Sequence, residues 1–279
     1  MARVSSLELI KRACEKGCAV PAFNIDNLES AIAVSEAMRE TGVPLIVQTI
    51  PRTLRYGGKA VYSAMMSALM EGCKTDYAMH LDHGDSAELA AECVRNGYTS
   101  VMFDGSGLSF DENVRITRGV AEASFPKGVS VEGELGKVGG SEESSFDVEP
   151  SCTDVGEAVK FTAATKVSAL AVSVGNAHGV YKGVPRINLA RISELYAAVD
   201  TPLVLHGASG LSDATLRDCI KAGIRKINFA TELRGAYTEG IKRGFARYPD
   251  SFDPKVYMRV AIDGIKEVVF RKIEICNEI

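Results

Sequence analysis

The chain has 279 residues, of which 46% are hydrophobic and 24% are charged, and its formal net charge at pH 7 is −4. This composition is typical of a globular protein with a large core, and it excludes the basic surface that nucleic-acid binding requires. No apolar run approaches the roughly 20 residues that span a bilayer, and the first residues lack the apolar segment of a signal peptide. We therefore expect a cytoplasmic protein that binds neither nucleic acid nor membrane, with its seven scattered cysteines reduced.

Apolar segments of strand length alternate with amphipathic segments of helix length along the whole chain. The expected strands cover residues 19–24, 44–50, 77–83, 100–104, 129–134, 169–174, 202–206 and 226–230. Residues 2–6 lead directly into an amphipathic helix, and the further expected helices cover residues 27–40, 62–73, 86–95, 111–123, 155–165, 213–222, 233–247 and 257–276. A polar stretch without periodicity, residues 136–151, follows the fifth strand.

Eight strands that are apolar on both faces and separated by helices predict a parallel sheet closed into a barrel. The length also fits such a barrel, which typically needs about 250 residues. The predicted fold is therefore a (β/α)8 TIM barrel with an extra C-terminal helix, and a doubly wound open sheet is the structural alternative. No Pro- or Ser-rich linker divides the chain, so we expect residues 1–279 to form a single domain.

The histidines gather at one end of the predicted barrel. Chemistry in α/β barrels takes place at the carboxyl ends of the strands, where the following loops converge. His83, His178 and His206 all fall at or just after such strand ends, whereas His80 lies further down its strand and is expected to be structural. Three imidazoles that leave a fourth position open suit a catalytic divalent metal, most naturally zinc.

Carboxylates accompany these histidines at the same strand ends. Asp82 precedes His83 directly and is a candidate proton carrier. Asp104 and Glu134 could provide an alternate or second metal position, or they could orient the histidine ligands. A second proton carrier could come from Glu142 or the adjacent glutamate of the polar stretch, whose glycines would allow it to fold over the site as a lid.

Short glycine-rich loops after the sixth, seventh and eighth strands suggest a phosphate site, because loops at these positions often bind phosphate through backbone N–H groups. The candidates are Gly179, Lys182, Gly183, Gly207, Ala208, Ser209, Gly210, Asn228, Ala230 and Thr231. A metal beside a phosphate site suggests a phosphorylated sugar whose carbonyl is polarised, so that an adjacent C–H or C–C bond can break.

Several segments resemble the class II, metal-dependent fructose/tagatose-bisphosphate aldolases, and the similarity runs nearly end to end. They are Val20-Pro-Ala-Phe-Asn-Ile25, Leu81-Asp-His-Gly84, Val131-Glu-Gly-Glu-Leu-Gly136, Ala177-His-Gly-Val-Tyr-Lys182, Leu205-His-Gly-Ala-Ser-Gly210, Lys226-Ile-Asn-Phe-Ala-Thr-Glu-Leu233 and Asp253-Pro-Lys-Val-Tyr-Met-Arg-Val260. The resemblance implies reversible cleavage of a ketose 1,6-bisphosphate to dihydroxyacetone phosphate and glyceraldehyde 3-phosphate.

The resemblance also implies a role for each matched residue. The zinc ligands would be His83, His178 and His206, with Glu134 and Asp104 at a second metal position or near a monovalent cation. Asp82 would exchange the proton of the C4 hydroxyl, and Glu142 would move the proton at C3 of dihydroxyacetone phosphate. The phosphate of that product would be held by Gly179, Lys182, Gly207, Ala208, Ser209, Asn228, Ala230 and Thr231. Arg259 would bind the distal phosphate, which is the one on the aldehyde half of the substrate, and it could do so across a subunit interface. The family forms homodimers or homotetramers, and some members work with a second subunit.

The substrate is less sharply defined. Asn228-Phe-Ala-Thr231 and Tyr257-Met-Arg-Val260 resemble the tagatose-bisphosphate branch, so tagatose 1,6-bisphosphate is favoured over fructose 1,6-bisphosphate or another phosphorylated ketose. The family usually has a small hydroxyl residue and a glycine where this chain has Ile50 and Arg52. Asn24 and Arg52 are therefore further candidate contacts, and an arginine at the barrel mouth could bind a phosphate or a carboxylate on a different aldehyde half.

Three other functions are compatible with parts of this pattern. A metal-dependent sugar-phosphate epimerase or isomerase would use the same site for a different reaction. A non-catalytic assembly subunit would be expected to have lost its ligands, but all three histidines are present. Class I aldolases use a Schiff-base lysine instead, and Lys226 lies on a late strand, but the three histidines favour the metal-dependent class.

Overall fold

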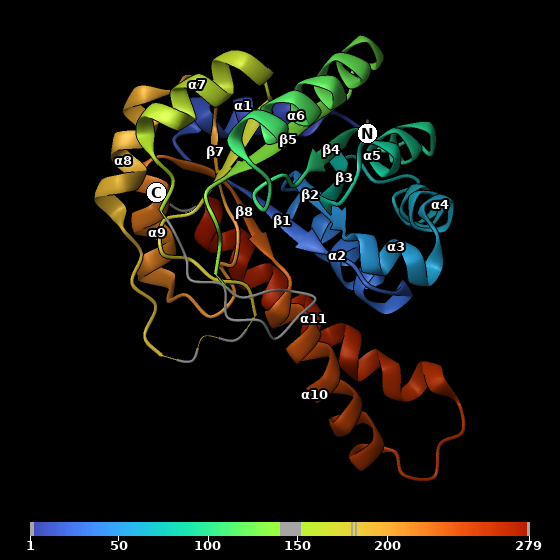
Figure 1. Ribbon diagram of the computed structural model, residues 1–279. Coiled ribbons are helices and arrows are strands. Elements are labelled where there is room, and N and C mark those ends of the chain that lie inside the picture. Colours follow the sequence, from blue (N-terminus) through green and yellow to red (C-terminus); the bar gives the residue numbers. More distant parts are fainter. Residues whose placement is uncertain (1–2, 140–151, 180, 182, 278–279) are drawn as a thin grey trace.

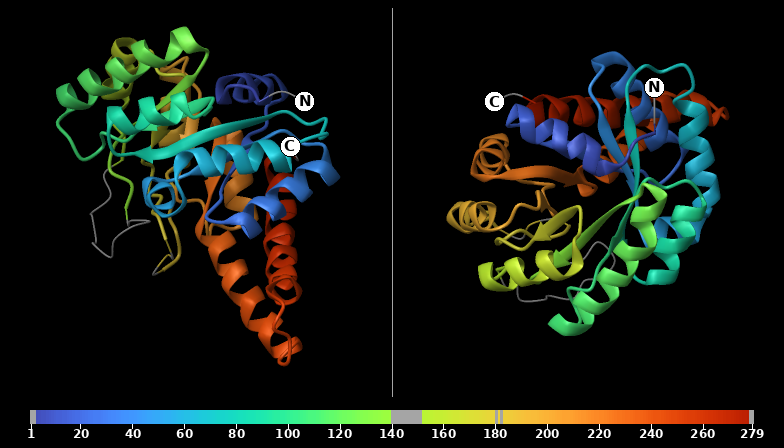
Figure 2. Two further views of the ribbon diagram at one scale, coloured as in Figure 1. Left: turned by 90° about the vertical axis from the view of Figure 1, so that its right-hand side faces the viewer. Right: turned by 90° about the horizontal axis from the view of Figure 1, so that it is seen from above.

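The strands close into a complete barrel in the computed structural model, which describes residues 3–139, 152–179, 181 and 183–277. All neighbouring strands are parallel and follow the sequence order, and β8 pairs with β1 to close the ring (Figure 1). The helices surround this ring, as the view from above shows (Figure 2). The (β/α)8 prediction is therefore confirmed, and the alternative of an open sheet is excluded because the ring has no edge.

The strands of the barrel are β1 Val20–Asn24, β2 Leu45–Thr49, β3 Tyr77–Gly84, β4 Ser100–Phe103, β5 Ser130–Leu135, β6 Ala169–Val172, β7 Leu203–Leu205 and β8 Ile224–Phe229. The helices are α1 Ser6–Lys16, α2 Leu28–Thr41, α3 Pro51–Gly57, α4 Lys59–Leu69, α5 Ala87–Arg95, α6 Phe110–Ser124, α7 Val155–Thr165, α8 Leu189–Ala198, α9 Asp213–Ala222, α10 Thr231–Arg247 and α11 Pro254–Asn277. A short 3-10 helix, η1, covers Phe125–Lys127.

Two helices lie where none was expected. α3 has only seven residues, too few for a helical period to be recognised, and it begins at Pro51, whose fixed φ suits the first helical position. α8 begins after Asn188, whose side chain accepts a hydrogen bond from the N–H of Arg191. The helix expected at residues 62–73 instead covers residues 59–69, because Gly72, with a φ of 72°, lies in the turn that follows.

α1 closes the amino end of the barrel. Leu9 and Ile10 pack against the small and apolar side chains inside the ring, among them Ala22 of β1 and Ala171 of β6. The hydroxyl of Ser6 lies 2.7 and 2.8 Å from those of the first residues of β4 and β5. A packed interior and a closed amino end leave the carboxyl ends of the strands as the place for chemistry.

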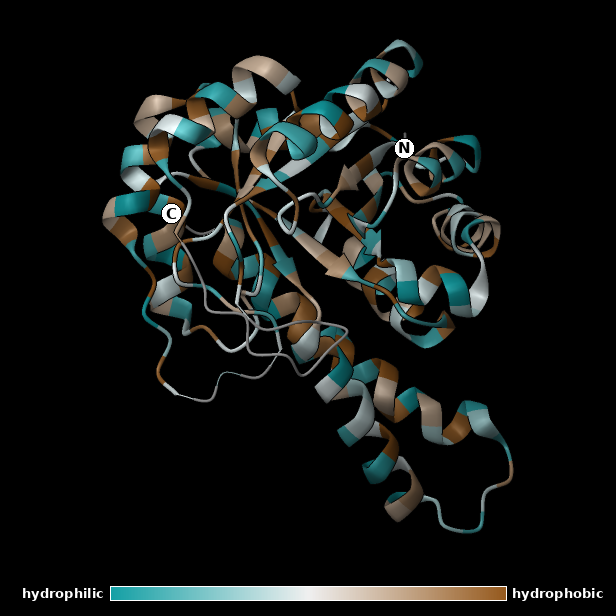
Figure 3. Ribbon diagram, in the orientation of Figure 1, coloured by the Kyte–Doolittle hydropathy of each residue, from teal (hydrophilic) through white to brown (hydrophobic). Residues whose placement is uncertain are grey.

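The surrounding helices are amphipathic, with apolar faces toward the strands and polar residues outward (Figure 3). α10 and α11 are antiparallel and project together beyond the ring before α11 returns along α2 (Figures 1 and 2). Among the described residues, no helix combines the length and hydropathy needed to cross a bilayer.

Charged side chains lie inside the barrel below its carboxyl rim. Glu132 of β5 accepts a hydrogen bond of 2.7 Å from Lys226 of β8, and both side chains are buried. The ring of His80 lies in the same layer, with Nδ1 2.7 Å from the hydroxyl of Ser100 and Nε2 3.8 Å from Glu132. His80 therefore has the structural position that the sequence indicated, and Lys226 is engaged in an ion pair.

His80 should make stability fall in mild acid. Burial, together with the positive charge of Lys226, lowers the pKa of His80 to about 3. Between that value and the pKa of about 6.5 in the unfolded chain, the unfolded state binds more protons, so the free energy of unfolding rises with pH. From pH 7 to pH 5 we expect the protein to lose about 2 kcal/mol more than its His80→Gln variant, measured by chemical denaturation at both pH values. Equal losses in the two proteins would contradict this assignment.

Candidate active site

The motif Leu81-Asp82-His83-Gly84 ends β3 with an irregular backbone. His83 has a φ of 48°, and the pairing register with β4 shifts between Leu81 and Gly84. A Cβ atom at Gly84 would lie 2.3 Å from the carbonyl oxygen of Met102, so only glycine fits beside β4. Left-handed backbone at a non-glycine residue is strained and is commonly retained at functional sites. Here it places two consecutive polar side chains at the mouth of the barrel.

His83, His178 and His206 come together at this mouth, as the sequence predicted. Their ring centroids are 4.6 to 6.0 Å apart, and one nitrogen of each ring lies within 4.8 Å of the others. Gly207 helps to bring two of them together, because its φ is 60° and a Cβ there would lie 2.3 Å from the carbonyl oxygen of Ala177. The loops after β6 and β7 can therefore pack closely against each other.

Carboxylates orient two of these rings. Nδ1 of His83 lies 2.8 Å from Oδ2 of Asp104, and Nε2 of His206 lies 2.9 Å from Oε1 of Glu132. Each contact occupies one ring nitrogen and leaves the other available to a ligand. Glu134 is placed between the rings, with Oε2 3.3 Å from Nδ1 of His206 and 3.8 Å from Nδ1 of His83.

The arrangement fits a bound cation. Nε2 of His83, Nδ1 of His206 and Oε2 of Glu134 are buried and have no hydrogen-bond partner, although buried polar atoms are normally paired. Burial alone would lower the pKa of His206, but the hydrogen bond to Glu132 and the nearby carboxylate of Glu134 raise this pKa to about 9. The site therefore attracts positive charge, which a divalent ion held by nitrogen and oxygen atoms would supply.

Asp82 is held by three side-chain amides from three strands. Asn24 of β1 and Gln48 of β2 each donate a 3.0 Å hydrogen bond to Oδ2, and Asn228 of β8 donates a 3.0 Å hydrogen bond to Oδ1. A carboxylate has about four acceptor positions, so one remains on Oδ1. That oxygen lies 3.9 Å from Nε2 of His83.

The charge of Asp82 is stabilised despite its burial. Burial raises the pKa of this carboxyl, but the nearby positive charges of His83, His206 and Lys226 outweigh burial and lower it to about 2. The three amide donors also favour the ionised form. Asp82 is therefore a carboxylate at neutral pH and can accept a proton through its remaining position on Oδ1.

The loops after β7 and β8 also meet, as expected of a phosphate site. The hydroxyl of Ser209 accepts 3.4 Å hydrogen bonds from the N–H groups of Ala230 and Glu232, at the start of α10. Ala230 provides no side-chain cap for this helix. Gly207 and Thr231 belong to the same pair of loops. The side chain of Asn228, which was expected among the phosphate contacts, is instead bonded to Asp82.

The remaining predicted residues have different positions. Lys182 and Glu142 lie outside the described residues. Gly179 follows His178 directly and has a φ of 82°. Arg259 is on α11, where its guanidinium donates two 2.7 Å hydrogen bonds to Glu36 of α2, so it is engaged away from the histidines.

Sequence reasoning missed three residues that support the site. Gln48 holds Asp82, Glu132 orients His206, and Lys226 is the buried counter-ion of Glu132. Each is a polar side chain within an otherwise apolar strand, and that contrast is the signal by which it could have been found. Burial of such groups requires partners, and the amide nitrogen of Gln48, the carboxylate of Glu132 and the ammonium of Lys226 each have one.

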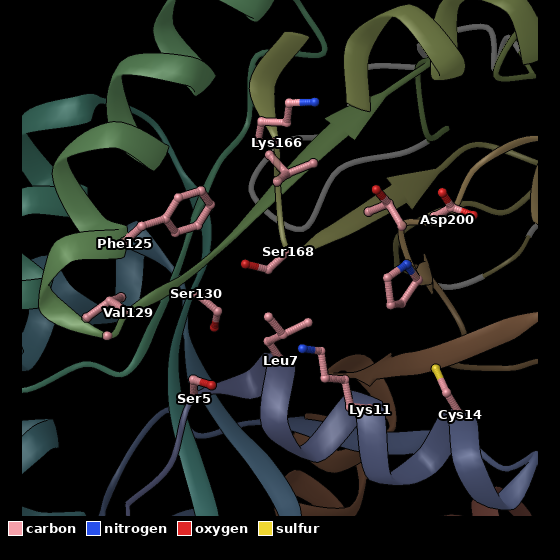
Figure 4. Close-up of a pocket in the computed structure, with 14 residues that line it drawn as sticks. Ser5, Leu7, Lys11, Cys14, Phe125, Val129, Ser130, Lys166, Ser168 and Asp200 are labelled. Atoms are coloured by element: carbon pink, nitrogen blue, oxygen red, sulfur yellow. The ribbon is translucent and has the colours of Figure 1, made fainter. Parts of the chain in front are cut away.

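A hollow of about 710 Å³ lies at the opposite end of the barrel (Figure 4). Lys11 of α1, Phe125 and Lys166 line it, with residues that precede β5, β6 and β7. None of the candidate catalytic or metal-binding residues in the described segments belongs to its lining. The hollow is therefore separate from the candidate site, whose side chains lie at the carboxyl end, where barrel enzymes have their active sites.

A closed (β/α)8 barrel with histidines and carboxylates gathered at the carboxyl ends of its strands has the architecture of a barrel enzyme. Residues 4–279 match the sequence family described as fructose-bisphosphate aldolase class-II. The chain therefore belongs to the class II fructose-bisphosphate aldolase family, whose members are lyases.

Solved structures agree with this assignment. The YdjI aldolase of Escherichia coli K12 is 31% identical, with a TM-score of 0.86, and the match covers 98% of this chain and 97% of that one. Fructose-bisphosphate aldolase from Campylobacter jejuni is 21% identical, with a TM-score of 0.83 and coverage of 98% and 95%, and shows the shared fold.

Proposed function

We propose that the protein is a zinc-dependent aldolase that reversibly cleaves a ketose 1,6-bisphosphate to dihydroxyacetone phosphate and glyceraldehyde 3-phosphate. One observation carries this proposal. Two open imidazole nitrogens and a carboxylate oxygen are buried without partners beside an ionised carboxylate that has one free acceptor position. His83, His178 and His206 would hold the ion, and Glu134 and Asp104 would lie at an alternate position or support these ligands. A bound zinc would supply Lewis-acid polarisation of the substrate carbonyl.

Asp82 would act as the base for cleavage. Its free position on Oδ1 accepts the proton of the C4 hydroxyl as the C3–C4 bond breaks, so that C4 becomes the aldehyde carbon of one product. The electron pair of the broken bond remains on the three-carbon half. Glu142 would then deliver a proton to C3, which completes dihydroxyacetone phosphate.

The phosphate of this three-carbon half would be held by the loops that follow β6, β7 and β8. Backbone N–H groups of Gly179, Gly207, Ala208 and Thr231 would donate to its oxygens, together with the hydroxyl of Ser209 and the ammonium of Lys182. The N–H of Ala230, which donates to Ser209 in the structure, would turn to the phosphate. The start of α10 favours an anion there because its first N–H groups have no acceptor within the helix. Asn228 would contribute by holding the carboxylate of Asp82 in place.

Tagatose 1,6-bisphosphate is the favoured substrate because Ala230 and the segment around Arg259 resemble the tagatose-bisphosphate branch. Fructose 1,6-bisphosphate, which differs only in configuration at C4, is the second candidate. A homodimer or homotetramer, a partner subunit, a single-domain organisation and a cytoplasmic location remain predictions.

The decisive experiment measures triose phosphate release from tagatose and fructose 1,6-bisphosphates in a coupled assay. We expect cleavage of both, with a higher kcat/KM for the tagatose isomer. An epimerase or isomerase would convert one ketose into another and release no triose, so that result would exclude the proposed reaction.

A further inference from the structure

A second pocket lies at the carboxyl end of the barrel, next to the candidate active site. It has a volume of about 570 Å³ and is lined by Asp26, Asn27, Ile50, Arg52, Thr53, Tyr56, Arg234 and Tyr237. These residues follow strands β1, β2 and β8. The same three strands supply Asn24, Gln48 and Asn228, the amides that hold Asp82. The pocket therefore lies beyond the carboxyl ends of the strands that hold the proposed base.

This position corresponds to the aldehyde half of the substrate. The proposed phosphate loops for the three-carbon half follow β6, β7 and β8, and the proposed base sits on β3 against β1, β2 and β8. In a ketose whose C4 hydroxyl meets Asp82, the carbons beyond C4 extend away from the three-carbon half. The side chains after β1 and β2 are then the ones that can meet the far end of the substrate.

The pocket carries a net positive charge that is not compensated. Its lining contains two arginines and one aspartate, which leaves one positive charge. Arg234 is committed to Asp26 through contacts of 2.7 and 3.2 Å, and Thr53 donates a further 2.8 Å hydrogen bond to the same carboxylate. For Arg52, by contrast, the described segments provide neither a hydrogen bond nor an ion pair. Arg52 is an exposed residue and lines the pocket.

The other arginine proposed for the distal phosphate is engaged elsewhere in the same chain. Arg259 donates to both carboxylate oxygens of Glu36 and also contacts Asp263. It is not part of the lining of the pocket. Among the described residues of one chain, Arg52 is therefore the cation of this pocket whose N–H groups are available to bind an anion.

We propose that Arg52 selects aldehydes whose far end carries an anionic group, a phosphate or a carboxylate, by pairing with that group in this pocket. The inference rests on the proposed aldolase reaction and assigns to it a specificity-determining residue. A guanidinium presents paired donors that match either anion. Ile50 and Arg52 stand where the family usually has small residues. In this pocket, Ile50 provides an apolar wall and Arg52 provides the cation.

The test compares aldehydes in the condensation direction, each with dihydroxyacetone phosphate. The three aldehydes are glyceraldehyde 3-phosphate, a four-carbon dihydroxyaldehyde that ends in a carboxylate, and neutral threose. We expect the ratio of kcat/KM for the preferred anionic aldehyde to that for threose to fall about 10- to 100-fold in Arg52→Met, which is the loss of one charge-assisted pair. Whichever anionic aldehyde has the higher kcat/KM in the unmodified protein identifies the group selected.

Arg55→Met is the matched control, because Arg55 lies on the same helix, pairs with Asp85 and does not line the pocket. Its ratio should equal that of the unmodified protein. An unmodified protein that uses threose as well as both anions, or an anionic preference that survives in Arg52→Met, would overturn the assignment.

A binding measurement separates this inference from the proposed reaction. 3-Phosphoglycerate has no aldehyde and cannot react, so calorimetry reports its affinity whether or not the protein is an aldolase. We expect binding at least tenfold weaker in Arg52→Met than in Arg55→Met. Equal affinities would refute the role of Arg52, whereas weaker binding without any condensation activity would refute only the reaction.

Discussion

Asp82→Ala is expected to lower kcat by about 10²- to 10⁴-fold while the protein retains its zinc, because the base is lost and the histidines remain. The carboxylate of Asp82 is the ionised group with a free acceptor position beside His83. Metal content is measured by elemental analysis of the purified variant, and kcat by triose phosphate release. KM should change much less than kcat if the role is proton transfer.

Asp85→Ala provides the control for this substitution. Asp85 is an exposed acid three residues further along that pairs with Arg55, so its removal should leave both kcat and metal content near those of the unmodified protein. A near-normal rate in Asp82→Ala would show that another group carries the proton. Loss of zinc from that variant would instead assign Asp82 to the metal site.

His206→Ala is expected to lose both bound metal and activity, with a drop in kcat/KM of about 10³-fold or more. The ring of His206 is fixed by Glu132 and directs Nδ1 toward Glu134 and the other two histidines. Loss of Lewis-acid polarisation removes several kcal/mol of transition-state stabilisation, which corresponds to this factor. Treatment of the unmodified protein with a chelator should have the same effect, and added zinc should restore activity only in the unmodified protein.

His80→Gln is the matched histidine control, because His80 lies below the site and contacts Ser100 and Glu132. We expect it to keep its metal in full, as measured by elemental analysis. Cleavage that persists at the normal rate after complete removal of metal would contradict the metal-dependent mechanism.

The fold and the centre of the site were predictable because both depend on local signals. Strand length and apolar character predicted eight strands, and a closed parallel barrel brings all of their carboxyl ends to one mouth. Polar residues at those ends must then converge, wherever they fall in the sequence. The positions of His83, His178 and His206 follow from this geometry and are confirmed as a cluster.

The partners of these residues were not predictable, because they depend on register across the sheet. Asn24 pairs with Gln48 between β1 and β2, and Gln48 pairs with His80 between β2 and β3. Only this alignment brings both amides to Asp82 at the same height. The helix α3 was missed for a different reason, because its seven residues are too few to show a helical period. The sequence therefore did not indicate that Arg52 lies on a helix.

In the proposed mechanism, the three amides around Asp82 would separate the bond-breaking step from the choice of aldehyde. They come from three different strands of a closed ring, so no single loop can tilt the carboxylate or rotate its free position. Changes in the short helix α3 after β2, where Arg52 lies, would then alter what meets the aldehyde half without moving the proposed base. If both proposals hold, a lineage with this barrel can exchange one aldehyde for another by substitutions outside the strands, while the groups for the bond-breaking step are inherited unchanged.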